Sequence, residues 1–169
     1  MKTLLTVLIL CAGAAWAAEK FTDKELAARF YYDLGADTVD VSGYPKAQQD
    51  GYAAFAKTCA QCHTLARPIN SPIAAKEDWR RYITRMHLKT KSTKGTDFSV
   101  EDARVILDFL AFDSNARKLK AKKDFDAKTA ELKARFESVL AARSRRQKEL
   151  DGKKVKDAPM PGQGVAPQP

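Results

Sequence analysis

Apolar residues recur at helical spacing in the stretch that begins at Pro45. Proline suits the first turn of a helix, because the N–H group that it lacks would have no intrahelical partner there. The pattern predicts a helix from Pro45 to about Cys59. The residues on its apolar face are Tyr52, Phe55, Ala56 and Cys59.

A second periodic stretch, SVEDARVILDFLAF, carries both a start signal and an apolar face. Ser99 is a good N-cap, and Glu101 and Asp102 stand in the first turn, where the helix dipole favours negative charge. The apolar positions that follow predict packing in the core. They are Val105, Ile106, Phe109 and Leu110.

The segment between these two, KEDWRRYITRMHLKTKS, predicts an amphipathic helix. At about 100° per residue, four of its side chains share one apolar arc about 100° wide, which is the face expected to point inward. They are Trp79, Tyr82, Ile83 and Met86. Met86 lies near the centre of the arc, and His87 lies at its edge beside charged neighbours.

The C-terminal part has no Gly or Pro from Asn115 to Leu150 and is rich in helix formers. A sparse apolar stripe with a seven-residue repeat runs along it. Its members are Phe125, Leu132, Phe136, Val139 and Leu140. We predict a basic amphipathic helix over 114–150 and, from the Pro, Gly and Gln content, a disordered tail over 151–169.

The remaining segments complete an all-α prediction, because no stretch of the chain reads as β. Residues 18–44 form an N-terminal extension with a short helix from Asp23 to Tyr32, and residues 45–113 form a small helical domain. The long charged C-terminal helix follows this domain.

The first 17 residues have the layout of a secretory signal peptide, with a lysine, an apolar run and the small-residue pattern AWA. The run is too short to cross a bilayer, and cleavage is expected after about Ala17. An uncleaved N-terminal anchor is the alternative. We expect a periplasmic protein whose mature chain has lost Cys11 and keeps Cys59 and Cys62.

Basic charge is concentrated behind the helical domain. Residues 18–114 contain 14 basic and 14 acidic side chains, whereas residues 115–169 contain 15 basic and 7 acidic ones. Two interpretations stay open: a solvated helix kept soluble by its charges, and an arm that docks on acidic surfaces of a partner. Peripheral contact with anionic lipid headgroups is a further option, and no nucleic acid is expected.

The stretch CAQCH places two cysteines three apart and a histidine directly after the second. Catalytic disulfides of this spacing usually occur in a βαβ setting, which this chain does not predict. A zinc site would need Cys59, Cys62, His63 and His87, and His63 adjoins a cysteine, which gives poor geometry around one ion. C-x-x-C-H is the signature of c-type haem attachment.

The spacing of this motif has a mechanical reason. Each thiol adds to one vinyl group of the porphyrin, and the imidazole of the next residue reaches the iron from the same side. We therefore expect one covalent haem c, tethered by Cys59 and Cys62, with His63 as the proximal iron ligand.

With this motif and these helices, the chain resembles the small monohaem cytochromes c from about Pro45 to Phe112. The resemblance implies a helix that runs into the motif, a second helix at the other haem face, and a third that crosses the first. It implies that Gly51 is the small residue at that crossing, where a mid-helix glycine otherwise costs about 1 kcal/mol relative to alanine. The expected fold is a cytochrome c-like haem-binding domain.

The resemblance favours methionine as the sixth iron ligand, which agrees with the central place of Met86 in the apolar arc. His87 is the alternative, and an open iron position is a third possibility. Trp79 and Ile83 are expected in the wall of the haem pocket.

The loop TLARPINSPIAA is expected to line the proximal side of the haem. The resemblance implies that a proline carbonyl beyond the motif accepts the N–H of the proximal imidazole. Pro68 and Pro72 are the candidates, and Pro68 is expected in the pocket.

These features together predict a periplasmic electron-transfer protein, not an enzyme. Its expected partners are redox proteins with an acidic docking surface, met through the basic C-terminal helix. One alternative is a haem-bearing subunit of a larger membrane or periplasmic oxidoreductase. Another is a haem-based gas sensor or ligand-binding protein, which would need an open iron position.

Overall fold

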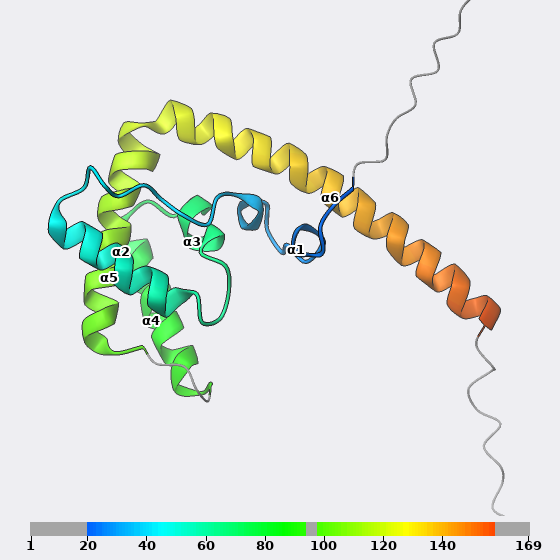
Figure 1. Ribbon diagram of the computed structural model, residues 1–169, viewed down its shortest axis with the longest axis horizontal. Helices are drawn as coiled ribbons and strands as arrows, with labels where there is room; N and C mark the ends of the chain where they lie inside the picture. The colour runs from blue at the N-terminus through cyan, green and yellow to red at the C-terminus, as the bar shows by residue number, and fades with distance from the viewer. Residues whose placement is uncertain (1–19, 94–97, 158–169) are drawn as a thin grey trace, which may run out of the picture.

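The computed structural model describes residues 20–93 and 98–157, and side chains as far as Lys153. The expected signal peptide, with Cys11, and residues 158–169 of the expected tail lie outside the described residues. Within them every regular element is a helix, which confirms the all-α prediction (Figure 1). The elements are α1 (Asp23–Leu26), the 3₁₀-helix η1 (Tyr31–Leu34), α2 (Lys46–Cys59), α3 (Ala66–Asn70), α4 (Lys76–Lys91), α5 (Val100–Asp113), the π-helix η2 (Ser114–Lys120) and α6 (Lys122–Asp157).

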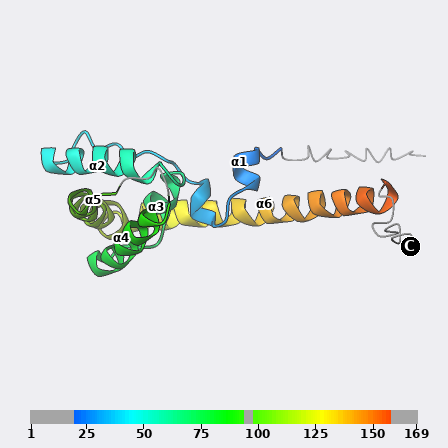
Figure 2. The ribbon, with the colours of Figure 1, turned by 90° about the horizontal axis from the view of Figure 1, so that it is seen from below.

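Helix α5 lies between α2 and α4 and packs on both (Figure 2). The α2–α5 crossing is close because Gly51 has no side chain. A Cβ atom at Gly51 would stand 2.9 Å from Cβ of Phe109 and 3.1 Å from the main-chain oxygen of Val105. The expected glycine at this crossing is thereby confirmed, since the two helices could not approach this closely around a larger residue.

The three helices enclose one hydrophobic core. Trp79 and Ile83 of α4 enter it, as the apolar arc of that helix predicts, and so does most of the predicted stripe of α5. Val105 packs against the core and is only half-buried. The buried members are Phe55, Ile69, Trp79, Ile83, Phe98, Ile106, Phe109 and Leu110.

The segment expected as a loop after the C-x-x-C-H motif contains a short helix, α3, and the prediction of a plain loop is corrected here. Asn70 supports it, because its side-chain Nδ2 donates to the carbonyls of Ala66 and Ala36, both at 2.8 Å. The carbonyls beyond α3 are met by Lys118, whose Nζ lies 2.9 Å from the oxygens of both Ser71 and Ile73.

The boundary expected between residues 113 and 114 falls inside the folded body. Ser114 is fully buried and accepts a 2.9 Å hydrogen bond from Nε1 of Trp79, and Asp113 accepts from the hydroxyl of Tyr44 at 3.1 Å. Arg117 donates from Nη2 to the carbonyl of Ile69 at 3.1 Å. Helix η2 therefore belongs structurally to the helical body, and α6 is the helix that extends beyond it.

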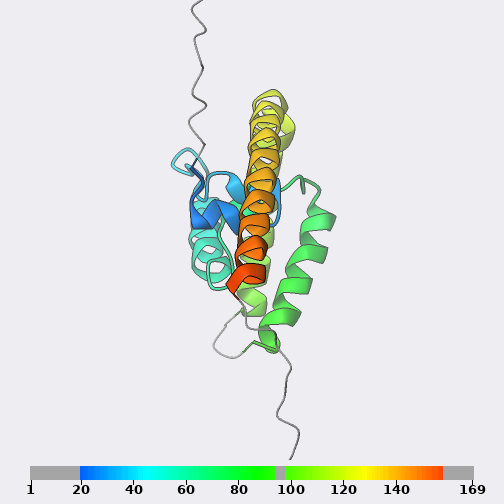
Figure 3. The same cartoon turned by 90° about the vertical axis from the view of Figure 1, so that its right-hand side faces the viewer.

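Helix α6 leaves this body and runs beside the N-terminal extension (Figures 1 and 3). Leu132 and Val139 of its predicted stripe are buried. Nη2 of Arg135 lies 2.6 Å from Oε1 of Glu25, and Nη2 of Arg143 donates to the carbonyl of Ala28 at 2.6 Å. The first part of α6 thus packs on the chain's own extension.

Two element boundaries differ from the sequence prediction. Helix α6 continues past Leu150 to Asp157, so the segment expected to be disordered from 151 begins inside a helix. The helix expected from Asp23 to Tyr32 is divided into α1 and η1, because Ala27–Phe30 turns between them. Among the described residues, no helix is both long enough and apolar enough to span a membrane.

Candidate functional site

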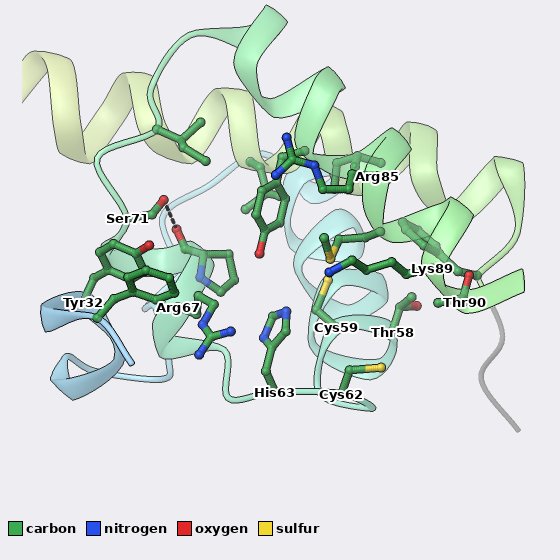
Figure 4. A pocket seen from close by; sticks show the side chains of 18 of the residues that line it. Tyr32, Thr58, Cys59, Cys62, His63, Arg67, Ser71, Arg85, Lys89 and Thr90 are labelled. Carbon is green, nitrogen blue, oxygen red and sulfur yellow. Dashed lines mark hydrogen bonds between the residues drawn. The ribbon is translucent and has the colours of Figure 1, made fainter. Parts of the chain in front are cut away.

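A cavity of about 630 Å³ opens between the C-terminal end of α2, α3, α4 and the N-terminal extension (Figure 4). This volume lies within the roughly 300–1,000 Å³ that is typical of cofactor and small-molecule sites. Four predicted site residues line it together: Cys59, Cys62, His63 and Met86. They come from the last turn of α2, the turn after it and the middle of α4.

The two cysteines lie on the same cavity and are not joined as a disulfide. Burial, and to a lesser degree the neighbouring Cys62, raises the pKa of the Cys59 thiol to about 12. Thiol–disulfide exchange and zinc binding both use the thiolate, the form that burial of Cys59 disfavours.

His63 stands at the mouth of the cavity with one ring nitrogen occupied. Its Nδ1 lies 3.0 Å from the carbonyl oxygen of Thr64. When Nδ1–H donates to this carbonyl, Nε2 keeps its lone pair and is the free metal-binding atom.

The carbonyl that meets His63 is not the one that the resemblance implied. Pro68 lines the cavity, but its oxygen accepts from Oγ of Ser71 at 3.0 Å and from Nζ of Lys118 at 3.4 Å. The partner of the imidazole is the adjacent Thr64, and the expected proline role is corrected on this point.

Met86 and His87 are separated by the turn of α4. Met86 lines the cavity and packs on the core. His87 is not among the lining residues. Its Nδ1 lies 2.7 Å from the carbonyl oxygen of Phe98, and its ring packs edge-on against the Phe98 ring with centroids 5.7 Å apart. Of the two candidate sixth ligands, Met86 is the one on the cavity.

Two of the three residues expected in the pocket wall line the cavity, and the third does not. Ile83 and Pro68 line the cavity. Trp79 is fully buried behind it, where its ring packs edge-on against Tyr82, and Tyr82 takes the place on the wall. The Trp79 side chain points into the core, where its indole N–H donates to the hydroxyl of Ser114.

Sequence reasoning missed the contribution of the N-terminal extension. Arg29, Phe30 and Tyr32 line the cavity beside Arg67 of α3. Burial opposes ionisation of Asp33, but hydrogen bonds from Arg67 and from the backbone N–H groups of Arg29 and Phe30 keep its pKa below the usual range. No signal in the sequence pairs Asp33 with Arg67, which stands 34 residues further along the chain.

A scan of family models and searches of curated proteins and of solved structures give no match to this chain. Within the described part of the chain, no group of three His, Cys, Asp or Glu side chains could hold a metal ion. A zinc site would need His87 beside the two cysteines. The structure instead places Nδ1 of His87 against the carbonyl oxygen of Phe98, away from the cysteines. The residues on the cavity are compatible with a tetrapyrrole: two thiols, one imidazole, one thioether, and apolar side chains such as Ile83 and Phe98 in the wall.

Proposed function

We propose that this chain binds one haem c through thioether bonds from Cys59 and Cys62, and that it transfers single electrons. The observation that carries the proposal is the meeting of Cys59, Cys62, His63 and Met86 on one cavity of about 630 Å³. The bound group would supply an iron that changes its charge by one electron.

Each of these side chains has a separate task in the proposal. The two thiols at the end of α2 would tether the macrocycle, and Nε2 of His63 and the sulfur of Met86 are the atoms that would bind its iron. Binding by the Met86 thioether would favour the ferrous state and so raise the reduction potential. The apolar part of the wall, including Ile83, would keep water from the iron and so would reduce the reorganisation that accompanies electron transfer.

The cellular setting is part of the same proposal. The signal-like N-terminus supports export, and the oxidising periplasm is where such a protein would work. Redox proteins with an acidic surface are the proposed partners. Lys148 and Lys153 are exposed near the end of α6, beyond Arg146, the last residue of α6 that the structure pairs with the extension, and this supports an attraction of this kind.

A redox titration of the protein purified from a host that attaches haem c tests the function. We expect one reversible wave with the slope of a single electron, and a ferrous spectrum that carbon monoxide leaves unchanged, because Met86 fills the sixth position. Rapid and tight carbon monoxide binding would instead favour a ligand-binding or sensing protein.

A further inference from the structure

The N-terminal extension builds one end of the cavity around a fixed arginine. Nε of Arg67 donates to Oδ1 of Asp33 at 2.8 Å, and Nη2 donates to Oδ2 at 2.9 Å. The guanidinium also lies over the ring of Phe30, 5.3 Å from its centroid. These contacts use one edge of the planar group, so its Nη1 donors remain for a second anion.

The charges around the cavity are one-sided. Among the described residues that line it are four basic side chains and no acidic one. They are Arg29, Arg67, Arg85 and Lys89. A cavity with this lining favours a ligand that carries negative charge, and arginine in particular matches the two oxygens of a carboxylate.

The position of Arg67 relative to the cysteines points to the part of the ligand that it meets. In Figure 4, His63 lies between Arg67 on one side and Cys59 and Cys62 on the other. A porphyrin carries its two carboxylate-bearing side chains at the edge opposite its two vinyl groups. A macrocycle tethered at the cysteines therefore directs its carboxylates away from them, past His63, toward the extension.

We propose that Arg67, held in place by Asp33, binds a carboxylate of the haem, and that the extension serves to complete this carboxylate site. The assignment rests on the proposed function. Asp33 acts as a positioning residue: its two oxygens keep the guanidinium fork aligned with the cavity. Helix α6 supports the same arrangement from outside, because Arg135 and Arg143 tie it to Glu25 and Ala28 of the extension.

The test compares variants that remove Arg67 without leaving a buried charge. Arg67→Gln alone would strand Asp33, whose side chain is 7% exposed, so the double variant Asp33→Asn/Arg67→Gln is used and leaves the net charge unchanged. Lys89→Gln is the control, because Lys89 also lines the cavity but lies on the cysteine side in Figure 4. Haem carboxyl carbons, labelled through ¹³C-5-aminolevulinate, report the carboxylate pKa by NMR of the ferrous protein.

We expect the double variant to keep its covalent haem and to bind a proton at one haem carboxylate at least tenfold more tightly than the wild type. Lys89→Gln should change that affinity less than twofold. An unchanged titration in the double variant, or an equal change in Lys89→Gln, would contradict the role of Arg67 and would leave the proposed function untouched. Absence of covalent haem from the wild type as well would overturn the proposed function together with this inference.

If the double variant takes up no haem, the titration of the haem carboxylates in the wild-type protein tests the role of Arg67. An arginine partner stabilises the ionised carboxylate, so one haem carboxylate in the wild type should titrate well below free propionic acid. Both carboxylates titrating at or above free propionic acid would contradict the assignment.

Discussion

Replacement of Gly51 by alanine tests the packing that places the haem motif at the end of α2. In an open helix this change stabilises by about 1 kcal/mol. At Gly51 the new Cβ would stand 2.9 Å from Cβ of Phe109 and 3.1 Å from the oxygen of Val105. Carbon atoms in good contact are about 3.5–4.0 Å apart, so α2 and α5 would have to separate by several tenths of an ångström.

Overpacking of this kind costs about 1–3 kcal/mol, and the Val105 oxygen cannot move away without moving α5. Against the gain in helix propensity, the net expectation for Gly51→Ala is a loss of about 1 kcal/mol, with a larger loss for Gly51→Val. Urea unfolding of the haem-loaded protein, followed by circular dichroism, measures the difference. The control is Gly152→Ala in α6, where a Cβ meets nothing within 4 Å and no loss is expected.

The comparison has a clear contrary result. If Gly51→Ala is as stable as Gly152→Ala, the helices do not cross at Gly51 as closely as described. A loss of stability with an altered urea dependence would point to a change in the unfolded state instead of the crossing.

Two further predictions concern the iron ligand and a buried lysine. Met86→Ala should lower the reduction potential and remove the weak near-infrared band of sulfur–iron ligation, whereas His87→Ala should do neither; the reverse pattern would make His87 the ligand. Burial and, less strongly, the nearby Arg117 lower the pKa of Lys118 from 10.5 to about 7, which the charge of Asp113 only partly offsets. Because the folded pKa is below the unfolded one, stability is lost as pH falls from about 10 to 7, by up to about 4 kcal/mol. Chemical unfolding at several pH values should show this slope in the wild type and not in Lys118→Met, and equal slopes would contradict it.

The three helices of the body could be predicted from the sequence because their signals are local. The N-cap at Ser99 and the apolar faces of α4 and α5 depend on spacing within one turn or two. Helix α3 could not be found this way, since the letters RPINSP are typical of a loop. What stabilises it are Asn70, which reaches Ala36, and Lys118, which meets the carbonyls that follow it.

The candidate site also contains residues with a local sequence signal and residues without one. The motif itself selects Cys59, Cys62 and His63 as candidates, and helical periodicity correctly predicts that Met86, and not His87, faces the cavity. The Asp33–Arg67 pair joins residues 34 positions apart, and no periodicity connects them. Lys118 stands in a lysine-rich run in which Lys120, Lys122 and Lys123 are exposed, so its burial follows only from the way η2 continues α5 across the body.

The covalent bond between the chain and haem is the central claim, and mass spectrometry of a digest tests it most directly. Cleavage with trypsin after Lys57 yields the peptide that begins at Thr58 and contains the whole C-x-x-C-H motif. In protein denatured and digested after expression with a haem-attachment system, this peptide should carry the mass of exactly one haem, with fragments that place it on both Cys59 and Cys62. The same peptide recovered without haem, with its two cysteines free or joined as a disulfide, would contradict the account.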